Sequence, residues 1–266
     1  MKFTFLGTSH GITEKDRFTS SILVESGGRS YLIDAGAPIM KLLREREVDL
    51  ASLSGIFITH SHCDHFLGLV EFMNQIECFN EFSGIRINVF GPENFPFAPM
   101  RYFLFGDESE HGTDKFIPPK TGGSRKKDDG EGHRVRFTRY TEGTIFDDGA
   151  MKITAIKTEH CPDSHAFLLE SEGKRALITG DLRVDLSDMP EIAFCERLDL
   201  LITEAAHPLW SEERIISRAR SILAPKIVIT HVCPFRNTEE HLSVAKERLS
   251  ASHTVISVTD GDIIEI

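Results

Sequence analysis

The sequence has no long apolar run, few cysteines and little positive charge, and each shortage excludes a class of protein. None of its stretches approaches the ~20 consecutive apolar residues that cross a bilayer, so no membrane-spanning helix is expected. Residues 1–8 read as a strand and a turn, because a signal peptide needs a longer apolar core and a cleavage site. The five cysteines are odd in number and scattered, which favours a reducing cytoplasm over a disulfide framework.

The charge balance argues against a general nucleic-acid binder. The chain of 266 residues carries 30 lysines and arginines against 41 acidic residues, a net charge of −11. A nonspecific nucleic-acid binder would need a broad basic surface. A small anionic substrate stays open, because bound metals can supply local positive charge.

Three of the 12 histidines lie in one short segment. Four potential metal ligands, His60, His62, Asp64 and His65, directly follow the apolar run 55–58. Extended backbone would point His60 and His62 to the same side, since they are two residues apart. Imidazole and carboxylate groups together suit zinc, and also iron or manganese.

Further apolar segments lead into ligand-type residues. The strand-like runs 31–33, 175–178 and 226–230 are followed by Asp34, Asp181 and His231, and the alternating segment 151–156 is followed by His160. Several strands leading to such residues in one chain indicate a common site at the edge of a sheet.

This ordered set resembles the five sequence motifs of the metallo-β-lactamase superfamily, over nearly the whole chain. The resemblance implies an α/β fold, a four-layer αβ/βα sandwich of two mixed β-sheets flanked by helices, with metals in a cleft at one edge. We therefore expect a single domain over residues 1–266, built from two similar halves, with an irregular insertion at about residues 91–132.

The resemblance also implies a ligand set for two divalent metal ions, with zinc favoured and manganese or iron as alternatives. The first metal would be held by His60, His62 and His160, and the second by Asp64, His65 and His231. Asp181 would bridge the two metals, and Asp34 would orient a ligand histidine. Cys63, Cys161 and Cys233 neighbour these ligands, either as thiolate ligands or, as we favour, as small filler side chains.

Two divalent metals ~3.5–4 Å apart can share a bridging hydroxide and steady the oxygens of an in-line displacement, which suits a phosphodiester. Asp64 would then orient or deprotonate the attacking water. His207 is the candidate general acid, tuned by Glu204; the alternative is a surface histidine beside a helix start. His10 and His165 are candidate substrate contacts, although a loop or a buried strand position explains them as well.

The insertion has two parts with different compositions. Its first half is rich in aromatic residues, which we expect to pack over the cleft. Its second half is polar, and Arg125, Lys126 and Lys127 could grip phosphates there. Two aspartates follow at once, so a solvated loop is the favoured interpretation.

Several segments indicate the branch of the superfamily. Residues 5–8 and 17–21 resemble the tRNase Z and cyclic-phosphate phosphodiesterase branch. Residues 200–205 look like the tRNase Z His-Glu-Ala-Thr signature, with Thr203 in place of its histidine. The span from His160 to Asp181 leaves no room for the tRNA-clamping arm of that family. Residues 160–164 and 179–183 resemble the DNA cross-link repair nucleases, whose extra domain the short span to His231 excludes.

The sequence therefore predicts a cytoplasmic dinuclear hydrolase, a phosphodiesterase acting on a small-molecule or single-stranded oligonucleotide substrate. The alternatives are a tRNA 3′-end processing endonuclease, a thioester or lactone hydrolase of the same fold, and a non-catalytic metal-binding protein. Neither a membrane nor a broad nucleic-acid surface is expected as a partner. Related enzymes are often dimers, so a homodimer is one expected state.

Overall fold

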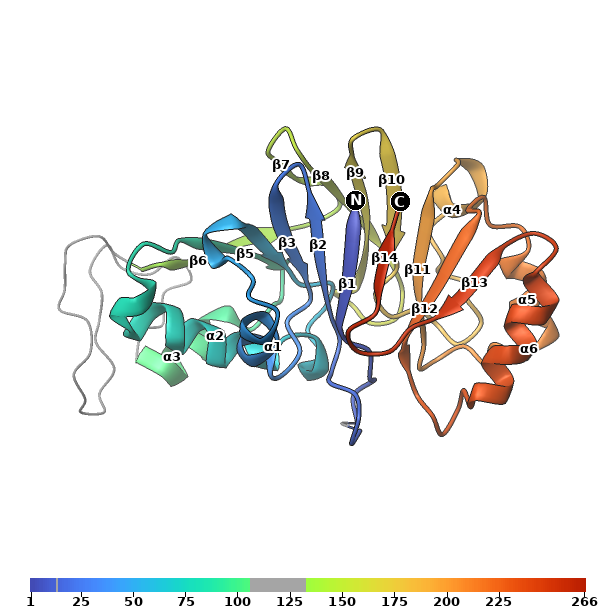
Figure 1. Ribbon diagram of the computed structural model, residues 1–266, viewed down its shortest axis with the longest axis horizontal. Helices are drawn as coiled ribbons and strands as arrows, with labels where there is room; N and C mark the ends of the chain where they lie inside the picture. Colours follow the sequence, from blue (N-terminus) through green and yellow to red (C-terminus); the bar gives the residue numbers. More distant parts are fainter. Residues whose placement is uncertain (13, 106–132) are drawn as a thin grey trace.

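The computed structural model describes residues 1–12, 14–105 and 133–266, and these form two β-sheets packed against each other with helices outside each (Figure 1). The first sheet has the order β14 (Ile263–Glu265), β1 (Lys2–Gly7), β2 (Ser21–Ser26), β3 (Arg29–Ile33), β4 (Leu53–Phe57), β5 (Ile87–Pro92) and β6 (Val135–Tyr140). The second has the order β13 (Thr254–Ser257), β12 (Lys226–Val232), β11 (Leu200–Ala205), β10 (Lys174–Ile178), β9 (His165–Ser171), β8 (Lys152–Lys157) and β7 (Gly143–Asp147).

Helices cover the outer face of each sheet. Those on the first sheet are α1 (Ile39–Glu45), α2 (Leu67–Cys78) and α3 (Phe97–Phe105). Those on the second are α4 (Ile192–Cys195), α5 (Glu213–Ala219) and α6 (Glu239–Leu249). One buried apolar cluster lies between the sheets and one lies between each sheet and its helices. The predicted four-layer sandwich is confirmed.

Both sheets share one pattern of strand directions. In the first, β14, β1, β2 and β3 pair antiparallel, and β3 to β6 pair parallel. In the second, β7 to β10 pair antiparallel and β10 to β13 pair parallel. Since the carboxyl ends of parallel strands meet at one edge, each half can deliver side chains to a common site there.

The segment expected to be irregular contains regular structure. Strand β5 extends to Pro92, and α3 follows within the predicted insertion. Phe95, Phe97 and Phe105 are buried in the apolar cluster beneath the first sheet. The prediction that these aromatics pack over the cleft is therefore wrong, because the sheet offers them a larger apolar surface. The predicted loop with Arg125 to Lys127 lies outside the described residues.

The last two strands belong to different sheets. Strand β13 runs parallel to β12, whereas β14 pairs antiparallel with β1 in the other sheet. Helix α6 supplies the crossover that places β13 beside β12. The final turn therefore carries the chain from one sheet to the other. Among the helices of the described residues, none has the length and apolar character to span a membrane.

Candidate metal centre

The predicted ligands of the first half follow strand β4 and lead into α2. His60 is fully buried, His62 is exposed, and Asp64 and His65 lie in a 3₁₀ turn that precedes the helix. The start of α2 packs closely on the loop after β3: a Cβ on Gly68 would come within 2.5 Å of the Gly36 carbonyl oxygen. A larger residue than glycine there would push His65 out of position.

The predicted ligands of the second half come from three segments. His160 lies in the loop between β8 and β9, Asp181 follows β10, and His231 lies near the end of β12. The backbone of His231 has φ 50°, a conformation that costs energy in a non-glycine residue. The β11–β12 pairing shifts register at this point, which turns the imidazole toward the cleft.

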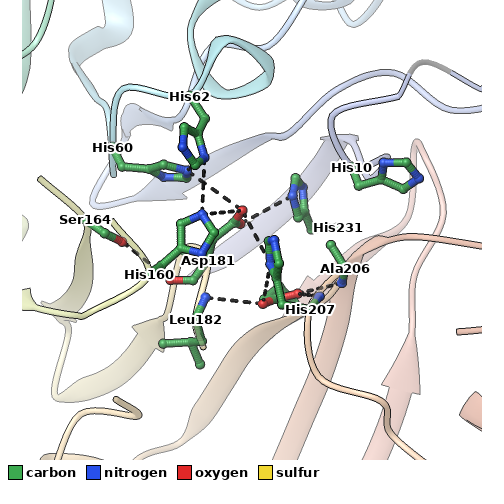
Figure 2. Close-up of polar contacts among 12 residues, drawn as sticks. His10, His60, His62, His160, Ser164, Asp181, Leu182, Ala206, His207 and His231 are labelled. Carbon is green, nitrogen blue, oxygen red and sulfur yellow. Dashed lines mark hydrogen bonds and ion pairs between the residues drawn. The ribbon is translucent and has the colours of Figure 1, made fainter. Parts of the chain in front are cut away.

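Asp181 lies at the centre of the site, facing ligands of both halves (Figure 2). Its Oδ2 is 3.8 Å from His60 Nε2 and 3.7 Å from His160 Nε2. Its Oδ1 is 3.4 Å from His65 Nε2 and 3.3 Å from His231 Nε2. The carboxylate thus has one oxygen for each predicted metal.

The seven side chains form two ligand groups. One consists of His60, His62, His160 and Asp181, the other of Asp64, His65 and His231, and the ligand atoms within each group lie within 4.8 Å of one another. His65 Nε2 and Asp181 Oδ1 are buried and have no hydrogen-bond partner among the described residues. Unpaired buried polar atoms are costly, and a cation between them would satisfy both, so the residues fit the expected metals.

Electrostatics within the site are strongly perturbed. Burial lowers the pKa of His60 well below its ordinary value, and neighbouring histidines add to that shift. Burial opposes charge on Asp181 as well, yet His231 and His65 hold its pKa well below the usual range. For His65, the burial effect is outweighed by Asp34 and Asp181, which raise its pKa. The site thus favours a carboxylate at its centre.

Asp34 holds two of the histidines in place. Its Oδ2 accepts a hydrogen bond from His65 Nδ1 at 2.7 Å, and its Oδ1 accepts one from the backbone N–H of Thr59 at 2.8 Å. The Thr59 hydroxyl donates to Asp34 and lies 3.0 Å from His60 Nδ1. The sequence analysis anticipated Asp34 but missed Thr59, whose only signal was its place directly before His60.

His207 and Glu204 are also brought to the centre. His207 Nδ1 lies 3.0 Å from Glu204 Oε1 and 3.8 Å from Asp181 Oδ2. Glu204 also accepts the backbone N–H groups of Leu182 and His207, at 3.2 and 2.8 Å. Burial alone would lower the pKa of His207, but Glu204 and Asp181 outweigh it and raise that pKa. His207 is not a surface histidine of the kind considered in the alternative interpretation.

His10 lies on the wall of a cleft of about 320 Å³ that also reaches Asp64, His207 and Cys233. Its Nδ1 accepts a hydrogen bond from the Ile12 N–H at 2.9 Å, and burial lowers its pKa. The loop that carries His10 is held by Asp260, in the turn between β13 and β14. Asp260 accepts hydrogen bonds from the N–H and hydroxyl of Thr8, at 2.9 and 2.7 Å, and from the N–H of Phe18.

The remaining candidates lie outside this cleft. His165 begins β9 and lines a separate pocket with Tyr140 and Lys157, so the structure does not bring it to the metals' cleft as the substrate contact expected. All five cysteines are free, and none belongs to either ligand group among the described residues. Cys161 donates to Asp163 Oδ1 at 3.1 Å. Burial and this hydrogen bond raise its pKa to about 12, which disfavours a thiolate ligand.

Comparisons with known proteins agree with this geometry. The profile of a family described as anti-Pycsar protein Apyc1 matches residues 1–96. Ribonuclease Z of Mycobacterium marinum is 28% identical over 190 residues, which cover 68% of this chain and 63% of that protein. The chain thus matches less than two thirds of this curated relative, and 49% of ribonuclease Z from Shouchella clausii.

Solved structures of similar fold cover the whole chain. The metallo-β-lactamase fold protein YhfI from Bacillus subtilis superposes with a TM-score of 0.73 at 19% identity, over 100% of this chain and 98% of that one. The short form of human tRNase Z superposes with a TM-score of 0.68 at 21% identity, over 100% and 99% of the two chains. At these sequence identities, the structural similarity shows that the chain shares the fold of these proteins.

Proposed function

We propose that this chain, which is similar in sequence to ribonucleases Z and in fold to metallo-β-lactamase fold proteins, is a dinuclear metal-dependent phosphodiesterase of the metallo-β-lactamase superfamily. The observation that carries the proposal is the position of Asp181, with one oxygen facing each ligand group. A carboxylate shared in this way suits two divalent metals and the hydrolysis of esters and phosphodiesters. A small or single-stranded phosphodiester is the substrate that we propose.

The two metals, zinc by this donor set, would acidify a water molecule and offset charge on the phosphoryl group when bound. Asp64 lines the cleft, with its Oδ2 3.5 Å from His65 Nε2, and would orient or deprotonate the attacking water. His207 donates a proton to the leaving oxygen. Its Nδ1 is engaged by Glu204, which leaves Nε2 for this transfer. His10, which lines the same cleft, would contact the substrate.

The test compares hydrolysis of bis(p-nitrophenyl) phosphate with hydrolysis of nitrocefin and of a thioester, after elemental analysis of the purified protein. We expect bound divalent metal and phosphodiester turnover that falls about 10²–10⁴-fold in Asp64→Ala. Asp147→Ala, which changes an exposed aspartate on β7, is the matched control. Turnover of the thioester alone would replace the proposed substrate class. An Asp64→Ala protein as active as the wild type would favour the non-catalytic alternative.

A second candidate, a tRNA 3′-end processing endonuclease, is favoured by the similarity to ribonucleases Z. The hairpin between β9 and β10 turns through only Glu172 and Gly173, so this part of the chain carries no arm for clamping tRNA. Precursor tRNA cleavage that is lost when Arg125, Lys126 and Lys127 are changed to alanine would support this candidate. Absence of cleavage by the wild type would remove it.

A further inference from the structure

The ligand histidines differ in the support that their side chains receive. His65 is held by Asp34, and His60 by Thr59. For His62 and His160, the hydrogen bonds in the described residues join ligand to ligand: His62 Nδ1 lies 3.1 Å from His60 Nε2 and 3.2 Å from His160 Nε2. His231 Nδ1 also has no hydrogen-bond partner among the described residues, but its backbone is fixed within β12. His62 and His160 lie on exposed loops, so other contacts must set their positions.

Both loops are joined by a single carboxylate, that of Asp163. Ser61, which lies between His60 and His62, donates its hydroxyl to Asp163 Oδ2. Cys161, next to His160, donates its thiol to Asp163 Oδ1. The two oxygens of the Asp163 side chain thus hold the neighbours of the two loop ligands, His62 and His160, across a sequence separation of 102 residues between Ser61 and Asp163.

The backbone of Asp163 is itself held in place by hydrogen bonds to neighbouring elements. Its carbonyl oxygen accepts a hydrogen bond from His165 Nδ1 at 2.9 Å, and the backbone N–H of His165 donates to the Thr59 carbonyl oxygen at 3.1 Å. His165 is buried at the start of β9. The Asp163 carboxylate is therefore anchored beside β9 of the second sheet and contacts the ligand loop that follows β4 of the first sheet.

We propose that Asp163 is a positioning residue of the metal centre, which ties the loop of His62 to the loop of His160 and so sets the geometry of the site formed by His60, His62 and His160. This inference rests on the proposed metal binding. Loss of Asp163 should affect metal binding at this site alone. Among the described residues, no contact joins Asp163 to Asp64, His65 or His231 of the other site.

Cobalt titration of the metal-stripped protein tests the inference, since the visible spectrum of Co²⁺ reports coordination geometry. Asp163→Ala is expected to weaken one of the two binding steps by about 10–100-fold and to change its spectrum, with the other step unchanged. Asp163→Asn keeps an acceptor for Ser61 and should recover part of the affinity. Ser61→Ala should produce a smaller loss of the same step, and the double variant Ser61→Ala/Asp163→Ala should lose no more than Asp163→Ala alone.

The outcomes separate this inference from the proposed function. Wild-type protein that binds no cobalt would overturn both. Normal cobalt binding by Asp163→Ala, or an equal loss at both steps, would overturn the role of Asp163 and leave the metal centre intact. A fall in the unfolding midpoint of the metal-free variant without any change in the cobalt spectrum would also overturn it. Asp147→Ala serves again as the control.

Discussion

Two carboxylate–histidine pairs, one from each half of the molecule, have similar hydrogen bonds and different surroundings. Asp34 and His65 are joined at 2.7 Å, with side chains 5% and 1% exposed. Glu204 and His207 are joined at 3.0 Å, with side chains 2% and 32% exposed. Asp34 also accepts the backbone N–H of Thr59, at the end of the neighbouring strand β4, whereas Glu204 accepts the N–H of His207 at the end of its own strand β11.

The difference in burial separates two functions of the same motif. Both nitrogens of His65 are enclosed, so its pair can only fix a ligand. His207 reaches the cleft, so its pair leaves one nitrogen for a substrate. Variants of the two pairs should therefore give different phenotypes.

Asp34→Ala should have the largest effect, on folding as well as on metal binding. Removing one partner of a buried charged pair costs about 3–5 kcal/mol, and loss of an orienting group weakens metal affinity about 10–100-fold. Urea unfolding of the metal-free protein measures the first and metal titration the second. The exposed Asp147→Ala should change stability by less than about 0.5 kcal/mol. Equal stabilities for the two variants would contradict the assignment of the buried pair.

His207→Ala should lower kcat by about 10²–10⁴-fold and leave the bound metal unchanged. The loss should be smaller for a p-nitrophenyl ester than for an alkyl phosphodiester, because a good leaving group needs no proton. Elemental analysis and steady-state rates on both substrates provide the measurement. His241→Ala, a histidine on α6, is the control. A loss of metal together with activity would make His207 a ligand instead of an acid.

Thr59→Val removes a buried hydroxyl and should cost about 1–3 kcal/mol, since Asp34 and His60 then each lose a partner. The backbone bond from Thr59 to Asp34 remains, so the effect should be smaller than that of Asp34→Ala. The two single variants and the double variant form a cycle measured by urea unfolding. Strict additivity would show that Thr59 does not act through Asp34.

Glu204→Gln should change the pH dependence more than the maximal rate. Glu204 raises the pKa of His207, and a general acid is lost as the pH rises through its pKa. Removing the charge lowers that pKa, so the fall in activity at alkaline pH should begin at a lower pH. The profile of kcat against pH measures this shift. A profile that stays unchanged, or moves to higher pH, would show that another group is the acid.

The residues of the site that can be predicted from the sequence are those that directly follow a recognisable strand. Ligand-type residues that follow apolar strands are visible as a pattern in the sequence. Thr59 and Asp163 were missed because their partners come from other strands, and a threonine or an aspartate beside a histidine has no distinctive spacing. His133 and His253 are buried as well, and nothing in their local sequence indicates it.

The hydrogen bonds of Asp260 have a consequence for the order in which parts of the site become structured during synthesis. Its bond to Thr8 spans 252 residues, so the ribosome makes the loop of His10 long before its anchor. Domains form from the amino terminus during synthesis, and distant contacts close late. The cleft wall of His10 should thus be the last part of the site to become rigid, which would delay activity until the nascent chain has emerged past the final turn.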